Sequence, residues 1–125
     1  MDLTPLIPAD RQVIDSYGRD VFRVAGVDHQ GSVLVFPEET LAWGPTRMAE
    51  VSLDSLRAVV QRGGVEILLL GCGMRMEMVP RALRQALRDA GIVVDAMDTG
   101  AACRTYNVLL SEERRVVAAL LPAGS

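Results

Sequence analysis

The pattern of hydrophobic and polar positions changes its period about half-way along the chain. In the first half, short apolar segments alternate with tight turns, as in antiparallel strands. In the second half, continuous apolar runs alternate with segments whose apolar residues recur at helical spacing, which predicts strand–helix–strand units. The expected strands cover residues 13–17, 21–24, 32–36, 66–70, 92–97 and 115–121, with 41–43 as a short extra piece. The expected helices cover about 52–62, 80–90 and 100–110.

This order of elements predicts an α/β fold with three layers. We expect a mixed central sheet flanked by helices, with an N-terminal β-hairpin as an added layer. In the N-terminal half of the chain, Asp28–Gly31 is expected to be a turn, because glycine stands at the last position, where type I turns favour it. The short link before the last strand allows that strand either direction. At 125 residues, the chain is expected to form a single domain, 1–125, in which 1–11 are an extended arm.

Composition narrows the class of protein. Half of the residues are hydrophobic but only 4% are aromatic, so the core is expected to be aliphatic. A net charge of −3 argues against sequence-independent binding of nucleic acid, which needs a basic footprint. Two cysteines are too few for a disulfide scaffold, and the N-terminus lacks the features of a signal peptide. The apolar runs are too short to span a bilayer. We therefore expect a cytoplasmic protein that is not embedded in a membrane.

Two predicted strands each run into a glycine-containing turn that leads to a helix. The first turn is Gly71-Cys72-Gly73, and the second begins at Asp98-Thr99. If the two strands are parallel neighbours, both turns lie at the sheet edge where α/β folds bind ligands, and helix amides there can bind an anion. The first turn lacks the full glycine set of a dinucleotide fingerprint and the lysine of a P-loop. A tight turn that needs permissive residues is the simpler interpretation.

The second turn carries side chains that allow either a chemical or a structural role. Cys103 is expected in the first turn of the third helix beside Arg104, and both features lower the pKa of a thiol. A small buried apolar residue is the favoured alternative. Asp98 and Thr99 most simply cap the helix. Asn107, a mediocre helix former, is expected to bond to an adjacent strand. The candidate ligand-binding residues are Gly71, Cys72, Gly73, Asp98, Thr99, Cys103, Arg104 and Asn107.

Three methionines alternate along the loop before Pro80, at positions 74, 76 and 78. Methionine is adaptable and recurs at binding surfaces, although a core plug or a dimer contact is the more conservative interpretation. A basic stretch overlaps this loop. It is either a binding face for an acidic partner or an ordinary helix face exposed to solvent. Its members are Arg75, Arg81, Arg84 and Arg88. The sequence contains no zinc, EF-hand, Ser-His-Asp or paired-carboxylate pattern, so neither a cofactor nor a catalytic residue is predicted.

Five segments carry a further signal when they are taken together: 14–18, 31–35, 70–73, 98–109 and 113–120. They resemble one small α/β family of unknown function, whose mitochondrial member is an assembly factor for respiratory complex I. The resemblance implies a three-layer fold with a mixed sheet, no established enzyme activity and no established cofactor. It also implies that some members help to assemble respiratory machinery by binding proteins. The family commonly has threonine where Cys72 stands and glycine where Glu113 stands, so a Cys72–Cys103 pair is not expected as a family trait.

Two hypotheses of function follow. The first is a non-enzymatic protein-binding module, with an unidentified protein partner, that aids assembly of a membrane-bound respiratory complex. The second is a small-molecule, anion or thiol-dependent site formed by Gly71–Gly73 and Asp98–Arg104. The second requires an accessible Cys103 whose pKa lies below the free value of about 8.5.

Overall fold

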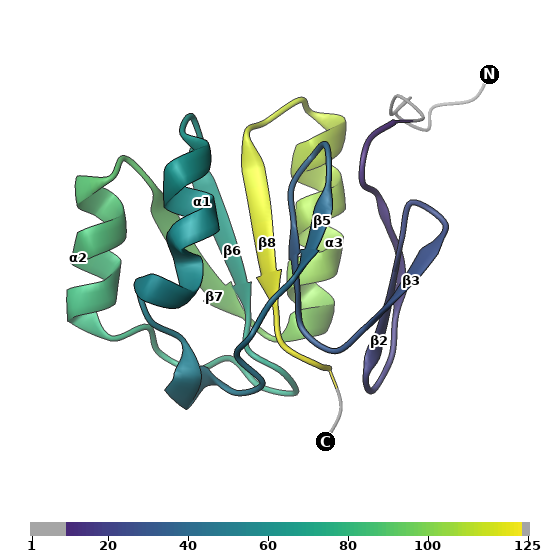
Figure 1. Cartoon of the computed structure of the whole chain (residues 1–125), viewed down its shortest axis with the longest axis horizontal. Helices are drawn as coiled ribbons and strands as arrows, with labels where there is room; N and C mark the ends of the chain where they lie inside the picture. Colours follow the sequence, from purple (N-terminus) through teal and green to yellow (C-terminus); the bar gives the residue numbers. More distant parts are fainter. Residues whose placement is uncertain (1–9, 124–125) are drawn as a thin grey trace.

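Two β-sheets and three α-helices make up the part of the chain that the structure, a computed structural model, describes, residues 10–123 (Figure 1). An antiparallel sheet near the N-terminus has the strand order β1-β2-β3. Its strands are β1 (Ile14–Tyr17), β2 (Val21–Val24) and β3 (Val27–Gln30). The central sheet has the order β5-β4-β8-β6-β7. Its strands are β4 (Val33–Val35), β5 (Thr40–Ala42), β6 (Ile67–Gly71), β7 (Val93–Met97) and β8 (Val116–Leu120).

The central sheet is mixed, as the sequence predicts. β6 is parallel to both of its neighbours, so that Leu69 pairs with Asp95 on β7 and with Ala118 on β8. β4 is antiparallel to β8 and to β5. The last strand, whose direction the sequence left open, is therefore parallel to β6. The carboxyl ends of three parallel strands consequently meet at one edge of the sheet.

Helices cover both faces of this sheet (Figure 1). On one face lie α1 (Arg57–Arg62) and α2 (Arg81–Asp89), preceded by two short 3-10 turns, Met48–Glu50 and Asp54–Leu56. On the other face lies α3 (Thr99–Ser111), which packs against β6 and β8 and, farther out, against β1. The N-terminal sheet shares this face with α3. The result is the three-layer α/β architecture expected from the sequence.

The core lies on both faces of the middle strands, which explains their continuous apolar runs. Leu68 and Leu70 of β6 face the cluster under α1 and α2, whereas Leu69 faces the cluster under α3. Along β8, Val117 and Ala119 face the first cluster and their neighbours face the second. Each fully buried leucine contributes roughly 1.5–3 kcal/mol relative to an exposed one. Leucine, valine and alanine dominate both clusters, as the low aromatic content predicts.

The expected turn at Asp28–Gly31 is wrong, because Asp28, His29 and Gln30 belong to the strand β3 and only Gly31 follows it. The chain turns earlier, at Ala25 and Gly26, whose φ angles are 48° and 79°. Val24 pairs directly with Val27, so only two residues connect the strands, and two positive φ angles are what a type I′ hairpin requires. β3 is an edge strand with solvent on most of its positions, and it therefore lacks the apolar alternation by which strands are predicted.

The start of the first helix also differs from the expectation. The first helix begins later than residue 52, because its start is a 3-10 turn rather than α-helix. The N-cap of this turn is Leu53 rather than the expected Ser52. Ser52 instead exchanges two hydrogen bonds with Ser55: its Oγ accepts the Ser55 amide N–H at 3.2 Å, and the Ser55 Oγ accepts the Ser52 amide N–H at 2.9 Å. Most of the expected arm, residues 1–11, lies outside the described residues.

Candidate functional site

Thr99 ties together the carboxyl ends of the three parallel strands. It is fully buried at the first position of α3. Its hydroxyl donates a hydrogen bond to the Leu121 carbonyl, just after β8, at 2.7 Å. The same hydroxyl accepts the Gly73 amide N–H, just after β6, at 2.9 Å, while the Thr99 amide donates to the Gly73 carbonyl at 2.9 Å. One side chain thus fixes the segments that leave β6 and β8 to the start of α3.

Asp98 and Gly71 allow α3 to begin this close to the sheet. The Asp98 carboxylate accepts the Ala101 amide N–H at 2.9 Å, so Asp98 is the N-cap of α3, as the sequence predicts. A Cβ atom on Gly71 would lie 2.9 Å from the Leu120 Cδ2 and 3.1 Å from the Thr99 Cα. A side chain at position 71 would therefore crowd the start of α3 and the Leu120 side chain, both of which would have to shift to admit it.

Both cysteines are buried and free. The Cys103 side chain is 2% exposed, and burial raises the pKa of its thiol to about 12, overriding the opposite influence of Arg104. Burial also raises the pKa of the Cys72 thiol, which lies 3.6 Å from the Leu70 carbonyl oxygen. These shifts are opposite in direction to the one that a thiolate-based site requires.

Arg104 and Asn107 point from α3 toward the N-terminal sheet. The Arg104 guanidinium donates to the Tyr17 hydroxyl at 3.1 Å. The Asn107 side chain accepts the Ile14 amide N–H at 2.9 Å and donates to the Ile14 carbonyl at 2.8 Å, which confirms that it bonds to a strand. The structure therefore brings Gly71, Gly73 and Thr99 together at the sheet edge, with Cys72 and Asp98 beside them. It places Cys103, Arg104 and Asn107 farther along α3.

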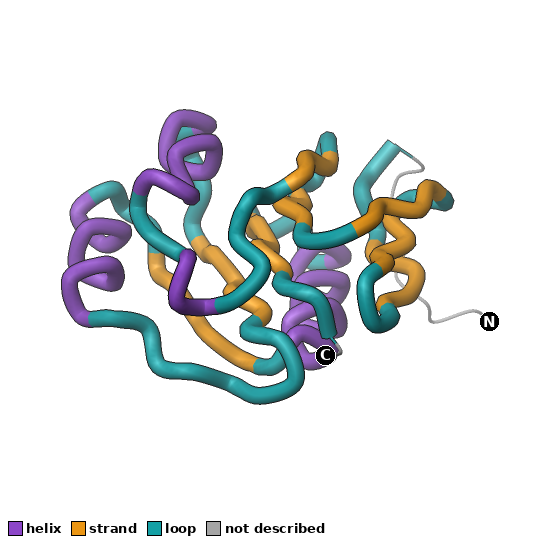
Figure 2. Tube along the Cα trace, turned by 60° about the horizontal axis from the view of Figure 1, so that its bottom comes forward, coloured by secondary structure: helices purple, strands orange, loops and turns teal. Residues whose placement is uncertain are grey.

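The loop 72–80 crosses the carboxyl edge of the sheet on its way from β6 to α2 (Figure 2). Its methionines at 74, 76 and 78 are 67%, 57% and 87% exposed. Among the described residues, eight large hydrophobic side chains are exposed, and three of them stand within these five positions. A core plug is therefore wrong for this segment, because Val79 takes the buried position instead. Concentrated exposed apolar side chains of this kind mark interaction surfaces.

This methionine loop is held at both ends and is locally basic. Gly73 at its start is bonded to Thr99, and the buried Val79 packs into the core at its end. Residues 74–88 contain four arginines and one glutamate, in a chain whose net charge is −3. Arg84 uses its guanidinium to bond the Val94 carbonyl at 3.0 Å, whereas Arg75 and Arg81 are exposed beside the methionines. The edge therefore offers an apolar patch with a positive border.

The described residues, 10–123, contain neither a candidate metal site nor a candidate membrane-spanning helix. Within them, no three histidine, cysteine, aspartate or glutamate side chains lie close enough together to hold a metal ion. No helix of this part of the chain is long and apolar enough to cross a membrane.

A pocket at the opposite edge of the sheet was not predicted from the sequence. It has a volume of about 270 Å³ and lies where β6 and β8 begin. Its lining comes from separate parts of the chain: Arg11, Phe36–Glu38, Arg62–Val65, Leu110–Ser111 and Glu113–Val117. The expected helix 52–62 ends directly before Gly63 and Gly64, which border this pocket, but nothing in the sequence marks these glycines as part of a binding site.

Comparison with known proteins decides the family. A family model described as "Protein of unknown function (DUF498/DUF598)" matches residues 14–121. This chain belongs to that family. The resemblance inferred from the sequence is thereby confirmed, and the match extends from β1 to just beyond β8.

Relatives in the DUF498/DUF598 family include both uncharacterised and named proteins. An uncharacterised protein of Rhodobacter capsulatus is 42% identical over 87% of this chain and 83% of its own length. The Danio rerio protein named NADH dehydrogenase [ubiquinone] 1 alpha subcomplex assembly factor 3 is 36% identical over 90% of this chain and 67% of its own length. The human protein of the same name is 32% identical, and this chain spans 62% of its length.

Solved structures show the same fold. The solution structure of a Bordetella pertussis protein described as a Mth938-like domain has a TM-score of 0.83 and is 29% identical. The alignment covers 100% of this chain and 94% of that protein. The mixed α/β architecture is therefore shared with an experimentally determined relative.

Proposed function

We propose that this protein is a non-enzymatic protein-binding module that aids assembly of a membrane-bound respiratory complex. The observation that carries the proposal is the exposure of the methionines at 74, 76 and 78. They lie in the methionine loop, residues 72–80, which is fixed at both ends and bordered by arginines. Support for the assembly role comes from relatives that are named assembly factors of NADH dehydrogenase. In this proposal the chain folds as one domain, 1–125, and acts in the cytoplasm.

The chemistry of the loop suits a protein partner. Burying a methionine side chain that is exposed in the free protein contributes roughly 1.5–3 kcal/mol. Methionine adapts to irregular surfaces, so the patch can fit a groove on a folding intermediate as well as one on a finished subunit. Because Thr99 and Val79 fix the ends of the loop, less conformational freedom is lost on binding. Arg75 and Arg81 favour a partner surface whose rim is acidic.

A crosslinking experiment tests this surface. A photoreactive amino acid is placed at Met76 and, as a matched control, at Val27 on β3, because both side chains are 57% exposed. We expect Met76 to crosslink subunits of a respiratory NADH dehydrogenase in host cells, and Val27 to crosslink none of them. Identical products from both positions, or no products from Met76, would contradict the proposal. Products that contain only this chain would identify the loop as a homodimer contact instead.

The alternative is an anion, small-molecule or thiol-dependent site at Gly71–Gly73 and Asp98–Arg104, and it has less support. The Gly73 amide is bonded to Thr99, and the Ala101 amide is bonded to Asp98, so both are already used within the fold. Cys103 is buried and its pKa is raised. Gly73 and Thr99 instead fix the start of the methionine loop. In the proposed function they therefore serve to position the loop that binds the partner protein.

A further inference from the structure

The pocket at the amino end of β6 and β8 combines an apolar floor with a charged rim. Phe36, Leu110 and Val116, which are almost fully buried, belong to its lining. The guanidinium carbon of Arg62 lies 4.1 Å from the centre of the Phe36 ring, so a cation stacks over one wall of the pocket. Gly63 and Gly64 border the pocket without side chains. Pro37 and Val65, which also line the pocket and are only partly buried, offer a ligand apolar surface beside this cation.

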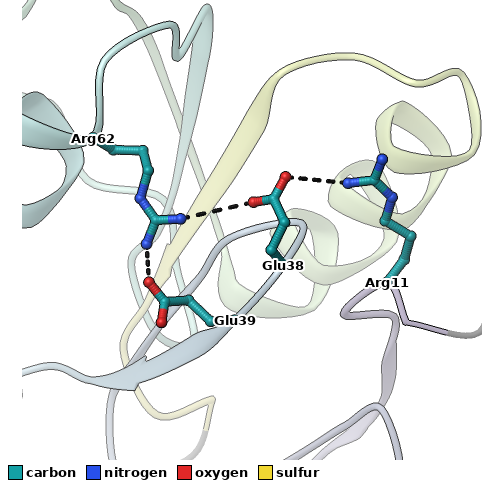
Figure 3. Close-up of polar contacts among 4 residues, drawn as sticks. All are labelled: Arg11, Glu38, Glu39 and Arg62. Atoms are coloured by element: carbon teal, nitrogen blue, oxygen red, sulfur yellow. Dashed lines mark hydrogen bonds and ion pairs between the residues drawn. The ribbon is translucent and has the colours of Figure 1, made fainter.

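Glu38 bridges two arginines at the mouth of this pocket (Figure 3). One carboxylate oxygen lies 3.2 Å from the Arg11 Nη1, and the other lies 3.7 Å from the Arg62 Nη1. Arg62 also pairs with Glu39 through its other terminal nitrogen. The Glu38 side chain is nevertheless 62% exposed, and Arg62 and Arg11 are 33% and 37% exposed.

This bridge can be replaced at small cost. Ion pairs between exposed side chains contribute little to stability, because water and salt screen them. A carboxylate on another molecule could take the place of Glu38 between the same two guanidiniums. It would gain in addition from burying an apolar group against the partly exposed Pro37 and Val65. Since α1 and α3 both end beside the pocket, their carbonyl ends disfavour an anion there, so the guanidiniums are essential for holding one.

We propose that this pocket binds a compact ligand that carries one carboxylate on an apolar body, and that Glu38 occupies the carboxylate position when the ligand is absent. A volume of about 270 Å³ suits a single aromatic or branched aliphatic group rather than a nucleotide. The same chemistry occurs in a free carboxylic acid and in the C-terminal residue of a peptide. The pocket lies at the sheet edge opposite the methionine loop. The proposal of a ligand there is therefore tested independently of the proposed assembly function.

The test is a titration of the full-length, isotope-labelled protein followed by NMR. The probes are 4-phenylbutyrate for a free acid and N-acetyl-phenylalanine for a peptide C-terminus. Their neutral amides are the matched control probes. We expect at least one of the two acids to shift the backbone amide signals of Gly63, Gly64 and Val116. The neutral control compounds should shift these signals far less. Binding of the first acid alone identifies a free acid as the ligand class, and binding of the second extends the site to peptide C-termini.

Two variants give opposite expectations. Glu38→Gln removes the internal competitor and should tighten binding several-fold. Arg62→Gln should weaken it at least about tenfold, the effect of losing a charge-assisted hydrogen bond. Arg57→Gln, on the same helix but paired with Asp54, is the control and should leave affinity unchanged. Equal binding of acids and amides, no shifts at the pocket, or a Glu38→Gln variant that binds no more tightly would each overturn the proposal.

Discussion

The side chain of Asn107 on α3 makes both backbone hydrogen bonds of Ile14 on β1, accepting from its amide and donating to its carbonyl. A neighbouring strand ordinarily supplies such a pair of bonds. Here one helical amide supplies them, and it thereby covers part of the outer edge of the N-terminal sheet. The hairpin layer is attached to the rest of the molecule through this contact and through the apolar cluster that contains Ile14, Phe22 and Tyr106.

Replacing Asn107 should therefore weaken the attachment of β1. We expect Asn107→Ala to lower the free energy of unfolding by about 2 kcal/mol, because the Ile14 N–H and C=O lose their partners. The loss should occur although alanine is the better helix former. Urea unfolding measures the change. Thr105→Ala, on the same helix, is the control and should change stability by no more than about 0.5 kcal/mol. Equal effects of the two substitutions would show that the contact with Ile14 contributes little.

Thr99 connects the core to the candidate binding surface. Thr99→Val keeps the shape of the side chain but removes the hydroxyl that bonds Gly73 and Leu121. We expect a loss of about 2 kcal/mol in the free energy of unfolding and faster hydrogen exchange at the Gly73 amide. Thr99→Ser keeps the hydroxyl, so the Gly73 amide should stay protected in that variant. If both variants exchange at the same rate, the hydroxyl does not fix the start of the methionine loop.

Stability should fall at alkaline pH because of the buried thiol of Cys103. Its pKa is raised to about 12 in the folded protein, whereas an unfolded cysteine has a pKa of about 8.5. The unfolded chain therefore loses this proton first. The stabilisation is complete below about pH 8.5 and declines as pH rises toward 12, by up to about 1.4 kcal/mol per pH unit. Burial also raises the pKa of Tyr106, which adds to the decline at higher pH.

The variant Cys103→Ala separates the two contributions. Its free energy of unfolding, measured by urea titration at a series of pH values from 7 to 10.5, should decline less steeply above about pH 8.5 than that of the unchanged protein. Parallel declines in the two proteins would mean that the Cys103 thiol titrates normally in the folded state. Such a result would revive the hypothesis of a thiol-dependent site.

The extent to which the sequence predicted the fold follows from burial. The strands β6 and β8 were predictable because both of their faces are covered, which produces unbroken apolar runs such as Ile67–Leu70. The cap at Asp98 and the strand contact of Asn107 were predictable because each residue type suits few other roles at those positions. The strand β3 was not predictable, since an edge strand in solvent carries no apolar pattern.

The candidate sites differ in the same way. Alternating methionines at 74–78 were visible in the sequence, but their exposure depends on Val79, which fills the core in their place. The pocket at the amino end of β6 and β8 could not be predicted from the sequence, because Arg11, Glu38 and Arg62 come from separate segments that only the folded chain brings together. Glu113 shows a further limit: its φ angle of 61° lies in the left-handed region that favours glycine, and a glutamate gives no sign of such a conformation in the sequence.

The most direct test of the proposed function is the amount of assembled NADH dehydrogenase in host cells that lack this protein and receive a variant. Native electrophoresis of their membranes measures the assembled complex. We predict that Met76→Ser/Met78→Ser accumulates as a folded protein but restores little of the complex, because two apolar contacts are lost. Val27→Ser/Val93→Ser, which removes two similarly exposed side chains elsewhere, should restore it fully. Full restoration by the methionine variant, or normal assembly in cells without the protein, would contradict the account.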